Sequence, residues 1–174
     1  RIDPKKLGAS MVTLEGEAFN YGDSQETFSI QSISKVISLT LAMNQVSEDL
    51  WRRVSHEPSG NAFNSIVQLE KEQGIPRNPL INAGALVLAD ILLQQKSLEA
   101  CIQSFTDFLF EVSGQDNIRI DHEVAQSELD TSHRNASLAH FMKSFNNLHQ
   151  PVEDVLKAYC HFCAVAMSCE QMSR

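Results

Sequence analysis

A serine and a lysine three residues apart, Ser32 and Lys35 in the run SISK, could together perform nucleophilic chemistry. Residues at this spacing share a helix face, which brings the lysine amine within reach of the serine hydroxyl. A lysine that is desolvated there has a lowered pKa and can act as the base that activates the serine. The start of a helix also offers backbone N–H groups that stabilise an oxyanion. The pattern alone is unspecific, and the alternative is a helix start exposed to solvent.

Three other polar residues have ordinary structural explanations. Asn82 opens an otherwise apolar segment and could be a simple helix cap, while Asn135 could hold a turn. Glu128 could equally lie on the solvated edge of a helix. Spacing alone therefore identifies none of the three as part of a site.

The cysteines favour packing over metal binding. Cys160 and Cys163 have the spacing of one half of a zinc site, but no second Cys pair or His pair follows them. The residues after Cys163 are apolar, as in a buried helix, so we expect both thiols to pack in the core and no metal site. All four cysteines lie in the second half of the chain. A secreted scaffold that depends on disulfides is usually a much smaller chain, so we expect reduced cytoplasmic thiols.

The composition is that of an acidic globular domain. The 174 residues include 14 Lys+Arg and 22 Asp+Glu, giving a net charge of −8, and 43% of them are hydrophobic. This length suffices for one domain with a hydrophobic core. An acidic chain without a basic cluster is not expected to bind nucleic acid, and its apolar stretches fall well short of the ~20 residues that span a bilayer. Because the sequence starts at Arg1 rather than Met, we expect a processed form or a fragment.

The hydrophobic pattern predicts strands at the beginning of the chain. We expect strands over residues 7–14 and 18–21, turned by Gly16, and a strand-like segment at 28–30. Two strands do not form a stable sheet alone. Either helices cover this hairpin or further strands are missing from the chain.

Helices are expected to dominate the remainder. Residues 57–64 and 74–79 should be loops, and residues 63–72 should form either a short helix or a strand. The apolar spacing predicts helices over residues 33–45, 81–93, 98–113, 121–128, 134–145 and 152–172.

Five ordered segments carry a more specific signal than any single motif. They are residues 22–35 (which include FSIQSISK), 57–64 (EPSG followed by FN), 74–85 (GIPRNPLINAGA), 127–135 (SE and RN) and 159–169 (Y and MSC). In order and approximate spacing they resemble the glutaminases of the serine β-lactamase-like fold. The resemblance extends over practically the whole chain.

The resemblance implies an α+β fold of the serine β-lactamase and transpeptidase kind, with an antiparallel sheet flanked by helices and a mainly helical subdomain. Residues 1–35 would belong to the sheet domain and residues 36–174 to the mainly helical region. Members of the family have a helical segment upstream and further strands downstream that complete the sheet. We expect these parts to be absent here, which makes the chain helix-rich, and we expect the isolated chain to be weakly active or inactive because an oxyanion donor is also missing.

The resemblance further implies hydrolysis of L-glutamine to L-glutamate and ammonia without a metal or organic cofactor. Ser32 would be the nucleophile that forms a γ-glutamyl ester, and Lys35 would accept its proton. The positions that match substrate contacts are Ser32, Asn82, Glu128, Asn135 and Tyr159. A carboxylate suits the substrate ammonium, and amide or hydroxyl donors suit its α-carboxylate.

Two alternative functions stay open from the sequence. The first is another Ser-Lys acyl hydrolase, of the β-lactam-binding type. The second is a non-catalytic helical interaction module with an acidic surface, in which Ser32 and Lys35 merely start a helix. For the enzyme, the resemblance suggests a cytoplasmic homo-oligomer whose partner is a small-molecule substrate, without nucleic acid or membrane.

Overall fold

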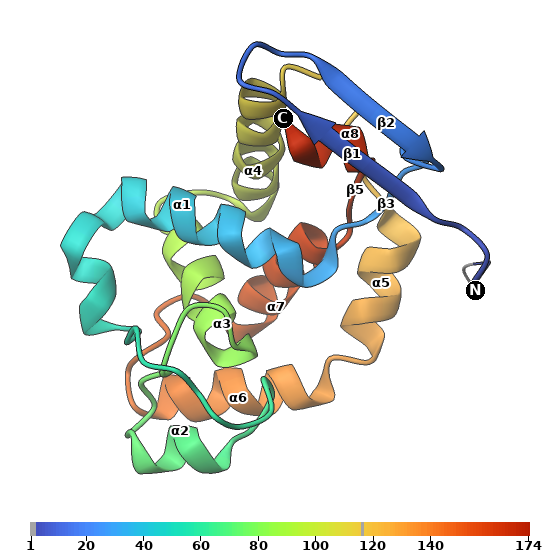
Figure 1. Cartoon of the computed structure of the whole chain (residues 1–174). Helices are drawn as coiled ribbons and strands as arrows, with labels where there is room; N and C mark the ends of the chain where they lie inside the picture. Colours follow the sequence, from blue (N-terminus) through green and yellow to red (C-terminus); the bar gives the residue numbers. More distant parts are fainter. Residues whose placement is uncertain (1–2, 116) are drawn as a thin grey trace.

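A helical body carries a β-hairpin at one end in the computed structural model, which describes residues 3–115 and 117–174 (Figure 1). The strands are β1 (Gly8–Val12), β2 (Ala18–Gly22), β3 (Phe28–Ser29), β4 (Arg119–Ile120) and β5 (Val165–Met167). The helices are α1 (Ser34–Val46), α2 (Val67–Lys71), α3 (Asn82–Leu92), α4 (Leu98–Ser113), α5 (His122–Asp130), α6 (His133–Ser144), α7 (Val152–Cys163) and α8 (Cys169–Ser173). Two 3₁₀ turns, η1 (Gln31–Ile33) and η2 (Ser47–Arg52), flank α1.

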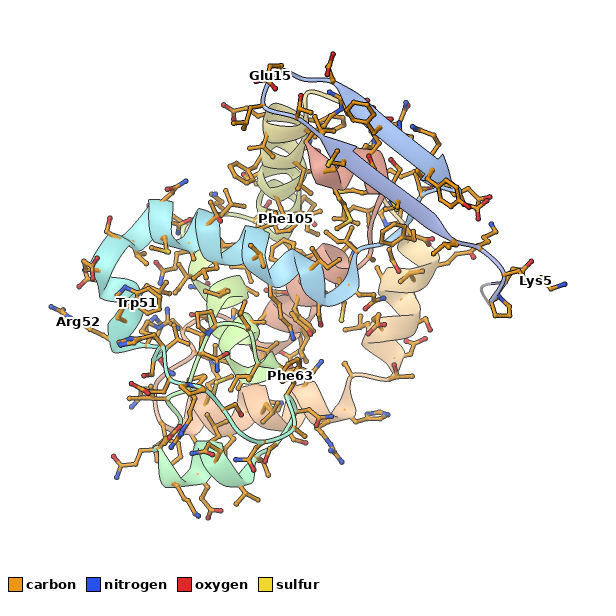
Figure 2. The ribbon with its side chains drawn as sticks, in the orientation of Figure 1. Lys5, Glu15, Trp51, Arg52, Phe63 and Phe105 are labelled. Carbon is orange, nitrogen blue, oxygen red and sulfur yellow. The ribbon has the colours of Figure 1, made fainter. Side chains whose placement is uncertain are left out.

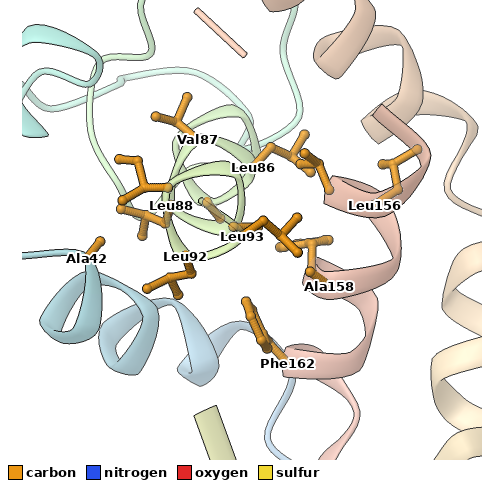
Figure 3. Packing of buried hydrophobic residues seen from close by; sticks show 14 of the residues in the cluster. Ala42, Leu86, Val87, Leu88, Leu92, Leu93, Leu156, Ala158 and Phe162 are labelled. Atoms are coloured by element: carbon orange, nitrogen blue, oxygen red, sulfur yellow. The ribbon is translucent and has the colours of Figure 1, made fainter. Parts of the chain in front are cut away.

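The core is built around α3, which is buried on all sides after its first residue. Its sequence is almost entirely apolar, as expected of a helix that is surrounded by other elements. Leucine side chains of α3 such as Leu86 and Leu92 lie among residues of α1 and α7, including Ala42 and Phe162 (Figure 3). The predicted helix over residues 81–93 is therefore confirmed, and it is the central element of the fold.

A glycine near the start of α3 allows the preceding loop to lie directly against the helix. A Cβ atom on Gly84 would lie 2.0 Å from the carbonyl oxygen of Asn78 and 2.8 Å from Cα of Pro79. The Asn78 side chain in turn accepts hydrogen bonds from the backbone N–H groups of Leu80 and Ile81. The loop before α3 and the first turn of α3 thus have a defined relative position.

The predicted hairpin forms, with Gly16 at its turn in the left-handed region (φ +88°). One face of the hairpin contacts α8, where Ser10 and Asn20 form hydrogen bonds to Ser173 and Glu170 at 2.9 and 2.7 Å. Of the two explanations that the sequence left open, a helix covering the hairpin is the one observed for this face.

The predicted single helix over residues 152–172 is wrong. The chain leaves the helix after Cys163 and forms β5, the central strand of a three-stranded antiparallel sheet of order β3-β5-β4. A short buried apolar run has no periodicity that separates a strand from a helix, so the pattern was ambiguous here. Ser168 then starts α8 with a capping box, in which its hydroxyl accepts from the N–H of Gln171 and the Gln171 side chain accepts from the N–H of Ser168.

The other predicted elements are confirmed apart from small shifts at their ends. The helix over residues 98–113 has the predicted ends because Ser97 accepts a hydrogen bond from the N–H of Ala100 and Gly114 adopts a left-handed conformation. The undecided segment 63–72 contains the short helix α2. Among the described residues, none of the helices is both long and apolar enough to span a membrane.

Candidate active site

Ser32 lies in the 3₁₀ turn η1, between the end of β3 and the start of α1, and it is exposed to solvent. The preceding residue, Gln31, has a left-handed backbone with φ +47°, a conformation that costs free energy for a residue other than glycine. The turn η1 connects strand β3 to helix α1. The strand-to-helix position predicted for Ser32 is confirmed.

Lys35 lies in the first turn of α1 and is only 2% exposed. Its Nζ donates a hydrogen bond to Oδ1 of Asn82 at 2.8 Å and lies 5.5 Å from the centre of the ring of Phe63. Figure 2 labels Phe63 in the loop that precedes α2. Burial lowers the pKa of the Lys35 amine. A lowered pKa increases the fraction of neutral amine near neutral pH, and only the neutral amine can accept a proton.

Ser32 and Lys35 lie next to each other at the start of α1, but the Lys35 amine donates its hydrogen bond to Asn82. Among the described residues, no hydrogen bond joins the Ser32 hydroxyl to the Lys35 amine, whose acceptor is Asn82. Hydrogen bonds of catalytic groups are commonly longer or less aligned without a bound substrate.

Asn82 connects the lysine to a second amide. Its Nδ2 donates to Oδ1 of Asn135 at 3.1 Å, so α1, α3 and α6 meet through Lys35, Asn82 and Asn135. The helix-cap interpretation of Asn82 is wrong, because the N-cap position of α3 is Ile81 and the Asn82 side chain points to other helices. Since both amide oxygens accept hydrogen bonds, these side chains have N–H donors left for a ligand.

Glu128 lies on α5 and faces the nucleophile turn. Its Oε1 accepts a hydrogen bond at 3.3 Å from Nε2 of Gln31, the residue before Ser32. Nε2 of Gln31 also lies 3.3 Å from Oγ of Ser29. Glu128 is thus half-buried and directed toward the turn that carries Ser32, which differs from the solvated helix edge considered from the sequence.

Tyr159 lies on α7 and is 7% exposed. Burial raises the pKa of its phenol, with smaller contributions from Cys163 and Glu128, so the hydroxyl stays protonated at neutral pH. Helix α7, which carries Tyr159, packs against α5, which carries Glu128. All six residues predicted from the sequence thus gather where η1 and helices α1, α3, α5, α6 and α7 converge.

Two further residues belong to this site without having been singled out from the sequence. Gln31 links the nucleophile turn to Glu128, and its signal is the positive φ, which only a structure reveals. Phe63 covers the lysine with its ring, and its carbonyl oxygen accepts from the N–H of Asn82 at 2.9 Å. Both residues lie within the segments that carried the resemblance, but no spacing rule predicts their contacts.

The structure also shows how Cys160 and Cys163 are placed. Cys160 and Cys163 are 1% and 3% exposed on α7, which confirms that they pack in the interior. Within residues 3–115 and 117–174, no cluster of three or more His, Cys, Asp or Glu side chains is arranged to hold a metal ion. The polar groups that these residues do offer are an amine, amide N–H groups and a carboxylate, which match the two opposite charges of a small zwitterion.

Comparisons with known proteins agree with this arrangement. The family model described as Glutaminase matches residues 1–174. The thermolabile glutaminase of Rhizobium etli is 51% identical over all 174 residues, which are 56% of that protein, and a glutaminase of Mesorhizobium japonicum is 53% identical over 173 residues, or 55% of its length. The chain thus spans about half the length of these relatives.

Solved structures give the same result for the fold. The crystal structure of a probable glutaminase from Bacillus subtilis superposes with a TM-score of 0.90 at 38% identity, covering 96% of this chain and 54% of that one. A second probable glutaminase superposes with a TM-score of 0.92 at 26% identity over 98% of this chain. The predicted fold class is confirmed by these superpositions. By sequence over its whole length and by fold, the chain belongs to the glutaminase family.

Proposed function

We propose that the protein containing this chain hydrolyses L-glutamine to L-glutamate and ammonia through a γ-glutamyl ester on Ser32. The observation that carries the proposal is the buried Lys35 amine, which lies one helical turn from an exposed serine and donates to Asn82, whose side chain in turn donates to Asn135. The relatives described as glutaminases support the choice of substrate.

In the first half-reaction the Ser32 oxygen attacks the carbon of the substrate carboxamide while the neutral Lys35 amine takes the hydroxyl proton. The negative charge that develops on the carbonyl oxygen is stabilised by backbone N–H groups, including that of Ser32. The C–N bond then breaks, and the leaving nitrogen takes up the proton from the Lys35 ammonium and departs as ammonia. Water attacks the resulting ester, giving glutamate and restoring the Ser32 hydroxyl.

The α-ammonium and the α-carboxylate of the substrate are bound by different side chains. The Glu128 carboxylate pairs with the α-ammonium through a charge-assisted hydrogen bond. Asn82 and Asn135 donate to the α-carboxylate through their remaining N–H groups, because the Asn82 oxygen already accepts from Lys35 and the Asn135 oxygen already accepts from Asn82. Tyr159 adds a neutral hydroxyl from α7.

The proposal includes a cytoplasmic, homo-oligomeric enzyme. All four cysteines are free thiols and three of them are buried, which supports a reducing compartment. The family resemblance supports the oligomer, and light scattering on the purified protein would measure its mass.

The function is tested by measuring ammonia and glutamate released from L-glutamine by the full-length polypeptide that carries these residues. We expect the two products in equal amounts, and no covalent labelling of Ser32 by benzylpenicillin. No release of ammonia, together with penicillin labelling, would replace this proposal by the β-lactam-binding alternative. Neither release nor labelling in a folded protein would favour the non-catalytic alternative.

A further inference from the structure

The ring of Phe63 lies over the Lys35 amine and takes no part in the bonds that form and break on Ser32. Its centre is 5.5 Å from Nζ of Lys35, within the ~6 Å over which a ring face and an ammonium attract each other. Phe63 is 61% exposed, whereas Lys35 is almost fully buried. One side of the ring therefore faces the amine, while much of the remainder faces water.

The start of α3 determines where the Phe63 backbone lies. The first N–H groups of a helix have no partner within that helix, and Ile81 at the N-cap has no side chain that could accept from them. The N–H of Asn82 instead donates to the carbonyl oxygen of Phe63 at 2.9 Å. Through its side chain, the same asparagine accepts the hydrogen bond of the Lys35 amine at 2.8 Å. Asn82 therefore holds both the amine and the residue whose ring covers it.

The loop that carries Phe63 is also held at its beginning. The N–H of Glu57 donates to the carbonyl oxygen of Arg77 at 2.8 Å, and the Glu57 carbonyl oxygen accepts from Nδ2 of Asn78 at 2.9 Å. The loop between η2 and α2 is thus fastened to the segment before α3 at Glu57 and to the start of α3 at Phe63. These hydrogen bonds place the ring over Lys35 without a bound substrate.

A ring in this position has two opposing effects on the amine. It excludes water, which favours the neutral form and lowers the pKa of a fully buried amine by up to about 3–5. The negative face of the ring attracts an ammonium, which raises the pKa by only about 1. Exclusion of water is therefore the larger effect, and the lowered pKa of Lys35, which burial causes, agrees with this order.

We propose that Phe63 is a positioning residue, whose ring keeps water away from the Lys35 amine and so keeps this amine ready to accept the proton of Ser32. The inference rests on the proposed function for its catalytic meaning. It extends that function to a residue that acts through Lys35 and not on the substrate carboxamide.

The shielding of the amine can be tested without reference to activity. In the full-length protein labelled with ¹³C at Cε of lysine, the Lys35 signal is assigned by its loss in Lys35→Met and followed by NMR as the pH is changed. We expect Phe63→Ala to raise the midpoint of this titration by about one pH unit, because water then reaches the amine. An equal or lower midpoint in Phe63→Ala would overturn the proposal, whether or not the protein hydrolyses glutamine.

Two variants show whether the effect belongs to the apolar cover at this position. Phe63→Leu keeps an apolar side chain without an aromatic ring and should retain a midpoint close to that of the natural protein. The matched control is Phe19→Ala, which removes a ring that is 55% exposed on β2 and should leave the midpoint unchanged. A midpoint in Phe63→Leu as high as in Phe63→Ala, or the same rise in Phe19→Ala, would contradict exclusion of water by Phe63.

The groups around Lys35 are the same in the natural protein and in these variants. Among the described residues, Cys163 of α7 is the one titratable side chain whose charge acts on the Lys35 amine, and burial raises the pKa of its thiol. Helix α3 presents the neutral amide of Asn82, and Glu128 of α5 is bonded to the nucleophile turn. Within the same described residues, η2 and α4, which also pack against α1, place no charge on the amine.

The consequence for the reaction is tested by the pH profile of kcat/KM for L-glutamine with the full-length protein. Because only the neutral amine accepts a proton, kcat/KM falls as the pH decreases through the pKa of Lys35. In Phe63→Ala we expect this limb to lie about one pH unit higher, with about a tenfold loss of kcat/KM below it. Above both midpoints the two proteins should have the same kcat/KM, whereas an equal loss at every pH would show a merely structural role and overturn the proposal.

The two experiments separate the ways in which the inference can fail. If the natural protein releases no ammonia, the proposed function fails, and the NMR titration alone decides whether Phe63 shields the amine. A raised NMR midpoint together with an unmoved pH profile of kcat/KM would overturn the role of Phe63 in the reaction.

Discussion

For Lys35, the sequence predicted the burial of the amine but not its hydrogen-bond partner. The Ser-x-x-Lys spacing correctly predicted a desolvated amine near the start of a helix, since the residue is 2% exposed in the first turn of α1. It did not predict the acceptor of that amine, because Asn82 is distant in sequence and reaches the lysine only through the packing of α3 against α1. Contacts of this kind leave no periodic trace in a sequence.

The buried amine should make stability depend on pH. Its pKa is lowered from an ordinary value of 10.5 in the folded state, so the unfolded chain binds more protons between the folded pKa and 10.5. The free energy of unfolding therefore rises with pH across this interval. In Lys35→Met this contribution is absent, and we expect the natural protein to gain stability relative to Lys35→Met from pH 7 to pH 10. Urea unfolding of both proteins at pH 7 and pH 10 measures this difference in unfolding free energy. The same difference at both pH values would contradict a lowered pKa of the buried Lys35 amine.

Glu128 provides a second test at the residue scale. Glu128→Gln keeps an oxygen that can accept from Gln31 but removes the charge that pairs with the substrate ammonium. We expect KM for L-glutamine to rise about tenfold to a hundredfold, in line with hydrogen bonds to charged groups, while the melting temperature changes little. An unchanged KM would remove Glu128 from substrate binding.

At the scale of elements, the pattern identified helices with clear end signals and failed where a short strand was buried. The helix over residues 98–113 has a serine before it and a glycine after it, and the structure has both ends as predicted. Residues 165–167 are apolar and buried, and they form hydrogen bonds to strands far away in sequence, so nothing local marks them as a strand. A serine three residues before a glutamine, here Ser168 and Gln171, is typical of a helix start. This pattern could have indicated that a new helix begins after residue 168.

That helix start can be weakened directly. Ser168→Ala removes the hydroxyl that accepts from the N–H of Gln171 and should lower the free energy of unfolding by about 1 kcal/mol. Ser168→Asp, which keeps an acceptor at the N-cap, should retain most of the stability. Equal unfolding midpoints for Ser168→Ala and the natural protein would show that the cap does not stabilise α8.

The start of α3 should be far more sensitive. In Gly84→Ala the new methyl group would lie 2.0 Å from the Asn78 oxygen, so the loop before α3 or the helix itself must move. We expect a loss of about 3 kcal/mol in unfolding free energy together with a raised KM, since Asn82 lies one half-turn away. Gly114→Ala is the control, because its added methyl group meets nothing within 4 Å and only the left-handed backbone (φ +58°) is strained, at a cost of about 1 kcal/mol. Equal losses in both variants would contradict the close contact of loop and helix.

At the scale of the whole molecule, the class of fold predicted from the sequence is confirmed, while the functional roles of the six site residues stay predictions. The six predicted residues come from six separate elements, and what collects them is the packing of α1, α6 and α7 around an apolar α3. The division into a sheet domain over residues 1–35 and a helical region over 36–174 stays a prediction.

The most direct test of the account compares ammonia release from L-glutamine by the full-length protein and by Ser32→Ala. The Ser32 side chain belongs to an exposed residue, so its truncation should leave the circular dichroism spectrum and melting temperature unchanged. The account predicts that the substitution lowers kcat by at least about 10³-fold, since the acyl-enzyme cannot form. A folded Ser32→Ala protein that still releases ammonia at a comparable rate would contradict the assignment of Ser32 as the nucleophile.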